Sequence, residues 1–161
     1  MPQSVITALE ELISIQQQLI VYADEKKTIL IDRRIDDLNE LVQQEARLVR
    51  QLNQADDKRE QAVTALMGAH PSLRFHEFID RLPDEIARKN IQSRMKTLQE
   101  LLVELQAKNK INEQLLKDAM EFVHHMIEEV TRSRQQQYNY QSPHGQQTPP
   151  AGGTGFFDTK A

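Results

Sequence analysis

Residues 91–130 read IQSRMKTLQELLVELQAKNKINEQLLKDAMEFVHHMIEEV, with apolar side chains recurring at every third or fourth position. This spacing is typical of a long helix that packs one narrow face against other helices. Asn109 and Asn112 interrupt the apolar series. A carboxamide on such a seam needs a hydrogen-bond partner. The two asparagines therefore either fix the register of a helical bundle or take part directly in recognition of a partner.

Two further helices are predicted on the N-terminal side. Apolar periodicity indicates one helix from a cap at Ser4 to about residue 31 and another from about residue 36 to a stop at Gly68, with a turn at residues 32–34. Residues 72–82 form a short helical segment whose bulky apolar groups could plug one end of a bundle. Pro83 then begins the long helix, which we expect to run to about Arg134.

These elements predict an all-α fold: an elongated antiparallel helical bundle or coiled coil of three main helices with a short connecting helix, followed by a disordered C-terminal tail. At about 1.5 Å per residue the long helix would span roughly 78 Å, against roughly 48 Å and 42 Å for the other two. Its C-terminal part should therefore overhang the bundle. That part carries a broad apolar face that calls for a binding partner: Leu115, Leu116, Ala119, Met120, Phe122, Val123, Met126, Ile127 and Val130. By pattern alone, the face is equally compatible with a buried core or a homodimer seam.

Residues 1–134 are expected to form the helical domain, and residues 135–161 a flexible low-complexity tail. The tail holds four of the five glycines and three of the six prolines of the chain, and such a composition cannot bury enough surface to fold alone. Phe156 and Phe157 are its apolar exception. They could form a short docking peptide, or the tail could fray or fold back on the bundle.

Composition narrows the class of protein. The chain has 161 residues, no cysteine and a formal charge of −4 with acidic and basic residues interleaved, which disfavours nucleic acid or an anionic membrane surface as the partner. It has neither a signal peptide nor an apolar run long enough for membrane insertion, so a cytoplasmic location is expected.

Candidate chemistry is sparse. His124 and His125 lie one turn from Glu121, Glu128 and Glu129, a spacing that could offer an imidazole and a carboxylate to one cation, but no further ligand set accompanies them. No nucleophile with a base and no phosphate-binding glycine loop can be assembled. We expect no enzyme, no catalytic residue, no cofactor and no metal.

Several segments resemble the FlgN-type flagellar export chaperones. They are Ile35-Asp36-Asp37-Leu38-Asn39-Glu40-Leu41 with its continuation through Arg59, the run Asn109 to Leu116 (Asn-Lys-Ile-Asn-Glu-Gln-Leu-Leu) followed by Phe122 and Ile127, and the ending Phe157-Asp158-Thr159-Lys160-Ala161. The resemblance covers essentially the whole chain.

The resemblance implies a cytoplasmic type III export chaperone. Such a protein binds the C-terminal helical segments of hook-filament junction proteins, prevents their premature assembly and delivers them to the flagellar export gate. The positions that match the family's cargo-binding helix are Leu115, Leu116, Ala119, Met120, Phe122, Val123, Met126 and Ile127. In relatives a tyrosine near the chain end takes part in gate docking; here Tyr138 and Tyr140 are the candidates, with Phe156 and Phe157 beyond them.

One alternative from another class stays open. A structural or regulatory homodimeric coiled-coil adaptor without a flagellar role would also use a long apolar helix face. A chaperone is expected to be a monomer or weak dimer that forms complexes with its cargo, whereas the adaptor would bury residues 115–130 in a tight homodimer.

Overall fold

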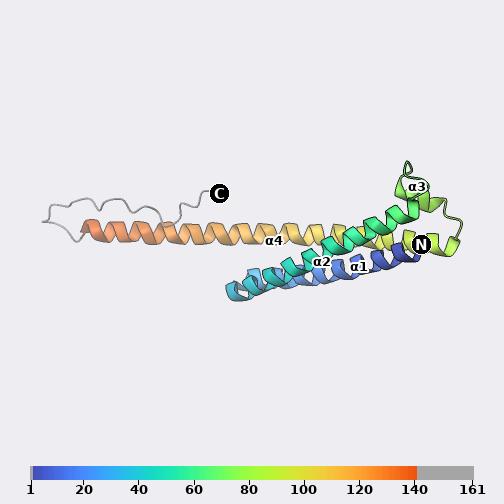
Figure 1. The fold of residues 1–161 in the computed structure, drawn as a ribbon. Helices are drawn as coiled ribbons and strands as arrows, with labels where there is room; N and C mark the ends of the chain where they lie inside the picture. The colour runs from blue at the N-terminus through green and yellow to red at the C-terminus, as the bar shows by residue number, and fades with distance from the viewer. Residues whose placement is uncertain (1, 141–161) are drawn as a thin grey trace. The chain divides into compact units, whose positions relative to one another are not determined.

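The computed structural model describes residues 2–140, which form four helices and contain no strand. The helices are α1 (Pro2–Asp32), α2 (Ile35–Met67), α3 (Phe75–Asp80) and α4 (Glu85–Tyr140) (Figure 1). The predicted all-α helical bundle is therefore confirmed. The chain divides into two compact units: unit 1 is Met1–Met120 and unit 2 is Glu121–Ala161, of which residues 121–140 are described.

Ion pairs between α1 and α2 show that these helices are antiparallel. Lys58 Nζ lies 3.1 Å from Glu11 Oε1, and Lys26 Nζ lies 2.5 Å from Glu45 Oε2. The residue numbers on α2 thus fall as those on α1 rise. Figure 1 shows the two helices side by side along most of their length.

The N-terminal part of α4 runs parallel to α1. Arg94 Nη2 lies 2.5 Å from Glu10 Oε1, and Lys108 Nζ lies 2.5 Å from Asp24 Oδ1. Both partners advance by fourteen residues between the two pairs, so the two helices stay in one register. The side chains of these pairs are partly exposed, and such pairs contribute little to stability but do report the alignment.

The core of unit 1 is built around α1, which has an apolar face wide enough to contact both other long helices. One buried cluster lies along the middle of the bundle: Leu12, Ile15, Leu19, Ile20, Ala23, Ala55 and Leu105. A second lies toward the end that holds the N-terminus: Val5, Ile6, Leu9, Ile79 and Ile91. Because burial of each such side chain is worth about 1.5–3 kcal/mol, these clusters hold the helices together.

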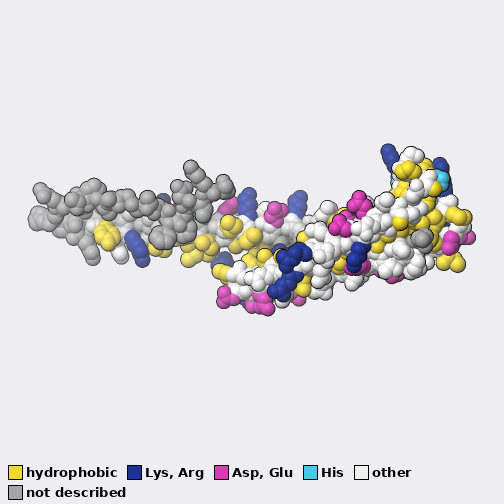
Figure 2. Space-filling model, in the orientation of Figure 1, with side chains coloured by type: hydrophobic (Ala, Val, Ile, Leu, Met, Phe, Trp, Pro, Cys, Tyr) yellow, Lys and Arg dark blue, Asp and Glu magenta, His cyan; other side chains and the backbone are white. Residues whose placement is uncertain are grey.

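The short helix α3 closes one end of unit 1, as the apolar residues of this segment predict. Ile79 is 1% exposed and belongs to the second cluster, and Phe75 and Phe78 pack against that cluster. Figure 2 shows hydrophobic side chains gathered around α3 and the adjoining ends of the long helices. The chain then enters α4 through Asp84, whose Oδ1 accepts hydrogen bonds from the backbone N–H groups of Ile86 and Ala87, both at 3.1 Å. Asp84 is therefore the N-cap, and α4 begins at Glu85. The prediction that Pro83 begins the long helix is wrong, because the cap lies between Pro83 and the first helical residue.

The ends of α1 and α2 differ in detail from expectation. α1 begins at Pro2, so the prediction that Ser4 caps it is wrong: proline suits the first helical turn, and Ser4 lies inside the helix. α1 ends at a turn in which Arg33 has φ 57° and the N–H of Arg34 donates to the Ile29 carbonyl at 3.1 Å. Gly68 does follow the last residue of α2, but its φ of −46° is right-handed. The left-handed C-terminal position that glycine favours is thus used at Arg33 and not at Gly68.

α4 continues to Tyr140, beyond the expected end near Arg134. Residues 135–139, placed by the sequence in the flexible tail, are helical and exposed. Glutamine is a good helix former, which accounts for the extension through residues 135–137. The rest of the predicted tail, residues 141–161, lies outside the described residues. Within the described part of the chain, no helix has an apolar stretch long enough to cross a membrane.

Candidate functional site

The candidate site residues are the apolar side chains of α4 that the sequence predicted, four of them in unit 1 and four in unit 2. The sequence places apolar residues here at the same three- and four-residue spacing that buries Ile91 and Leu105 earlier in the helix. Since a helix turns about 100° per residue, these positions all fall on one broad side of α4. The face is described separately for the two units.

In unit 1 the face comprises four of the predicted residues. Leu115 and Ala119 are partly buried, whereas Leu116 is 43% exposed and Met120 is 65% exposed. Burial of the α4 stripe therefore decreases toward the end of this unit. Leu116 and Met120, four residues apart, point their apolar surface into solvent.

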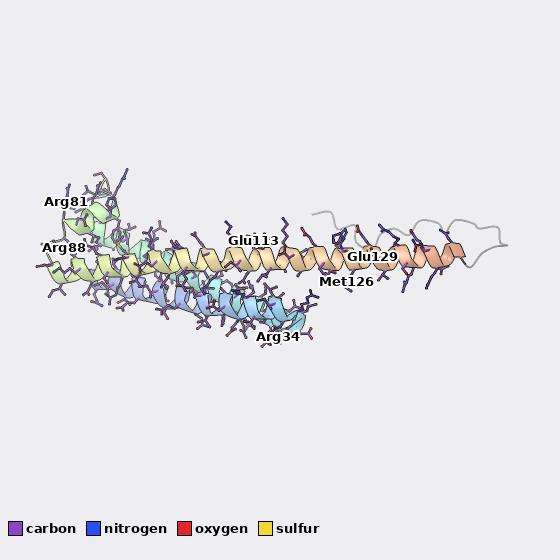
Figure 3. All side chains as sticks on the ribbon, turned by 180° about the vertical axis from the view of Figure 1, so that it is seen from behind. Arg34, Arg81, Arg88, Glu113, Met126 and Glu129 are labelled. Carbon is purple, nitrogen blue, oxygen red and sulfur yellow. The ribbon has the colours of Figure 1, made fainter. Side chains whose placement is uncertain are left out.

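In unit 2 the remaining predicted residues are all exposed, between 46% and 53%: Phe122, Val123, Met126 and Ile127. Val130, one turn further on, is 53% exposed. Figure 3 shows the place of Met126 on α4. Every side chain from residue 121 to residue 139 falls in the exposed class. Contiguous apolar surface of this kind marks a protein-binding site on a folded protein, and methionine adapts its shape to varied partners.

The other side of the same helix segment is polar. His124 Nε2 lies 3.3 Å from Glu128 Oε1, and His125 Nδ1 lies 3.8 Å from Glu128 Oε2. These histidine and glutamate side chains are the ones that the sequence analysis considered as metal ligands. Among residues 2–140, no group of three or more His, Cys, Asp or Glu side chains is arranged to hold a metal ion. The segment is therefore amphipathic, with apolar residues on one side and His–Glu pairs on the other.

The two asparagines have different environments. Asn112 is 4% exposed, and its Nδ2 donates a hydrogen bond to the Ala23 carbonyl of α1 at 2.8 Å. Asn109 is exposed. The register hypothesis therefore fits Asn112 and is wrong for Asn109. The apolar spacing of the sequence would place Leu102 on the buried seam, but Leu102 is 43% exposed. Leu101 packs against the core in its place. Because a helix has 3.6 residues per turn, either of these two neighbouring positions can face the core.

The gate-docking candidates are spread over two parts of the chain. Tyr138 lies on α4 and is 77% exposed. Tyr140 is the last residue of α4, and Phe156 and Phe157 lie outside the described residues. The structure therefore places Tyr138 on a helix and not on the flexible stretch that was predicted for it.

One feature of unit 1 escaped the sequence reasoning. A groove of about 420 Å³ lies where α1, the start of α2 and α4 meet, and its apolar lining comes from Leu30, Leu38, Val42 and Leu116. The first three residues belong to the apolar stripes of α1 and α2. The signal in the sequence was that these stripes continue up to the turn at residues 32–34, where a bundle has no further helix to cover them.

A helical bundle with exposed apolar side chains on its longest helix is typical of proteins that bind other proteins. The FlgN protein family matches residues 1–148, and the chain belongs to that family. The family consists of flagellar export chaperones, and this chain is accordingly a flagellar export chaperone. The family is not known for enzymatic activity.

Similarity to individual proteins is distant. The chain is 20% identical over 159 residues to a protein of Bacillus subtilis (strain 168) described as "Uncharacterized protein YvyG", a match that covers 99% of this chain and 98% of that protein. No solved structure matches the chain.

Proposed function

We propose that this chaperone binds the C-terminal helical segments of hook-filament junction proteins, prevents their premature assembly and delivers them to the flagellar export gate. The observation that supports the proposal is the exposed apolar face of α4, with Leu116, Met120, Val123, Met126 and Ile127 at helical spacing. A protein destined to polymerise through helices has apolar helical ends before assembly. An apolar helix face of the chaperone can cover such ends by the helix-in-groove mode of recognition.

The energetics suit temporary binding. Burial of apolar side chains favours binding, whereas the ordering of a cargo segment opposes it. Segments that fold on binding therefore bind with lower affinity for a given interface area, which favours later release. No nucleotide or cofactor is required for either step.

Replacing Met126 with Asp tests the binding face. The variant should bind a peptide with the C-terminal helix of a junction protein at least tenfold more weakly, because it loses the burial of one large side chain and places a charge in an apolar contact. Isothermal titration calorimetry measures the affinity. His125→Asp is the matched control: it adds the same charge at the next position, about 100° around the helix and on the polar side. This control should bind within twofold of the unchanged protein.

Circular dichroism and thermal melting establish that both variants keep their helices. Because Met126 is 53% exposed, its replacement should leave the melting temperature nearly unchanged. Equal affinities for the Met126→Asp variant and the unchanged protein would show that the cargo binds elsewhere.

A second copy of the chain is the rival occupant of this face. We expect a monomer or weak dimer that forms one-to-one complexes with cargo. Sedimentation equilibrium at micromolar concentration separates the two cases, since a tight homodimer that Met126→Asp dissociates would assign the face to self-association.

A further inference from the structure

The groove in unit 1 has apolar and polar lining residues from α1 and α2 that are not part of the proposed cargo face. It combines four apolar side chains, Leu30, Leu38, Val42 and Leu116, with the polar residues Asn112 and Glu113. Val42 is 47% exposed and Leu116 is 43% exposed, so their apolar surface remains open to solvent. By contrast, another hollow of similar size is lined by Asp57, Glu60 and other mainly polar side chains of α2.

Asn112 lines the groove and ties α4 to α1. Its side chain is more than nine-tenths buried, and its Nδ2 donates a hydrogen bond to the Ala23 carbonyl of α1. Its Oδ1 accepts no hydrogen bond from any described protein group, but this atom is itself buried, so it is not open to a segment that lies in the groove.

The charges at the groove indicate what kind of segment fits. Lys26 and Glu45 line it but neutralise each other in an ion pair at 2.5 Å. Glu113, labelled in Figure 3, lines it from α4 and is exposed, with no ion pair to another described residue. The groove therefore presents apolar surface and one carboxylate that has no ion pair among the described residues.

We propose that this groove binds an amphipathic helix of the export cargo, which covers Val42 and Leu38 with apolar side chains and places a basic side chain near Glu113. The inference rests on the proposed function, because it takes the occupant to be the junction-protein segment. It adds a second contact surface on unit 1 to the exposed face of α4. A helix fits because Asn109, Asn112 and Leu116 are spaced by three and four residues along the groove wall, which is the spacing at which a packed helix makes contact.

Val42→Gln and Val49→Gln form a matched pair for the test. Both valines lie on α2, one heptad apart, with exposures of 47% and 42%, but only Val42 lines the groove. The probes are synthetic peptides that carry the C-terminal helix of each hook-filament junction protein encoded in the same genome. Calorimetry should show at least fivefold weaker binding for Val42→Gln and a change of less than twofold for Val49→Gln. Glu113→Lys should also weaken binding at low salt and lose its effect as salt is raised.

A direct readout does not depend on any substitution. Methyl resonances of Leu38 and Val42 should shift when the peptide is added, whereas those of Val49 should not. Thermal melting of all variants verifies that unit 1 stays folded.

The outcomes separate the two proposals. If Val42→Gln and Val49→Gln both bind within twofold of the unchanged protein and the Leu38 and Val42 methyls do not move, while Met126→Asp loses binding, the groove inference is overturned and the proposed function stands. If the unchanged protein binds none of the peptides, both are overturned. A homodimer that Val42→Gln disrupts would assign the groove to a second copy and would also overturn the inference.

Discussion

Asn112 joins α4 to α1 through one buried hydrogen bond, and this makes it the side chain with the greatest influence on the register of unit 1. A one-residue slip of α4 would move its carboxamide away from the Ala23 carbonyl and bury it without a donor or acceptor. Such a slip costs more than the loss of an exposed polar contact, because a buried unsatisfied group pays its full desolvation penalty. A polar position on the seam thus excludes alternative alignments that apolar residues alone would tolerate.

Asn112→Asp should strongly destabilise unit 1. The change replaces the Nδ2 donor with a carboxylate oxygen facing the Ala23 carbonyl, and we expect the free energy of unfolding to fall by about 2–4 kcal/mol at pH 7. Burial would raise the pKa of the new carboxyl above its value in the unfolded chain, so the variant should regain stability as pH falls toward about 4. Urea denaturation at pH 7 and pH 4 measures both effects. Asn109→Asp, at an exposed position, should change the free energy of unfolding by less than about 0.5 kcal/mol.

Lys108 contributes to the stability of unit 1 in a way that depends on pH in the alkaline range. The hydrogen bond from Lys108 to Asp24 raises the pKa of the ammonium group above 10.5. A raised pKa of a basic group means that its contribution is complete below the pKa of the unfolded chain and is lost as pH rises through the folded value. Lys108→Gln should therefore melt at a lower temperature than the unchanged protein at pH 7, and the two should converge above pH 10.5. Lys110→Gln is the control, because Lys110 is exposed and has no ion pair to a described residue. If the melting temperatures of Lys108→Gln and the unchanged protein still differ at high pH, the effect comes from packing of the side chain.

Among the helices, α3 has only six residues but helps to determine how the long helices pack. It has no capping side chain and is too short to be stable alone. It persists because Ile79 enters a cluster with Val5 and Ile91, which closes the end of unit 1 and sets where α4 begins. The position of α4 along α1 thus depends on a connection as well as on the long helices.

Ile79→Ala should destabilise unit 1 by about 2–5 kcal/mol, because it removes buried methylene groups and leaves a cavity at a site with 1% exposure. Thermal and urea denaturation measure the change. Ile86→Ala removes the same groups at a position that is 77% exposed, and its effect should stay within about 0.5 kcal/mol. Similar losses for the two variants would show that α3 is not a structural plug.

For the whole molecule, holding cargo and delivering it can be assigned to different parts of the chain. The proposed cargo surfaces lie at or before residue 127, whereas the candidates for gate docking lie at or after Tyr138. We propose that residues from Tyr138 onward contact the export gate while the cargo remains bound to α4. This separation makes the two activities distinguishable by mutation.

Two variants test the separation. Removal of residues 141–161 eliminates Phe156 and Phe157, and Tyr138→Ala removes an exposed side chain from α4. Each should leave the affinity for the junction-protein peptide within twofold but reduce secretion of that junction protein, measured in culture supernatants of strains that express the variant at native level. Full motility and normal secretion with both changes combined would exclude a delivery role for these residues.

Much of this protein could be predicted from its sequence because its fold depends on local periodicity. The three- and four-residue spacing of apolar residues, which includes Ile91, Leu98 and Leu105, defines a helix face. Gly68 marks the end of α2, and Pro83 lies just before the start of α4. The family, too, was evident from linear motifs such as Asn109 to Leu116. These properties reside in neighbouring residues, so they can be inferred without knowledge of what the helices contact.

The tertiary structure alone decided which members of a periodic series are buried. Asn109 and Asn112 are equivalent in spacing, yet only Asn112 reaches the Ala23 carbonyl, because the parallel register of α4 and α1 is set by contacts between residues more than eighty positions apart. The groove lined by Leu30, Val42 and Leu116 arises for the same reason, since it exists only where three helices end or separate. Spacing along one helix specifies the direction in which a side chain points, but only the packing of all three helices determines whether another chain segment is there to meet it.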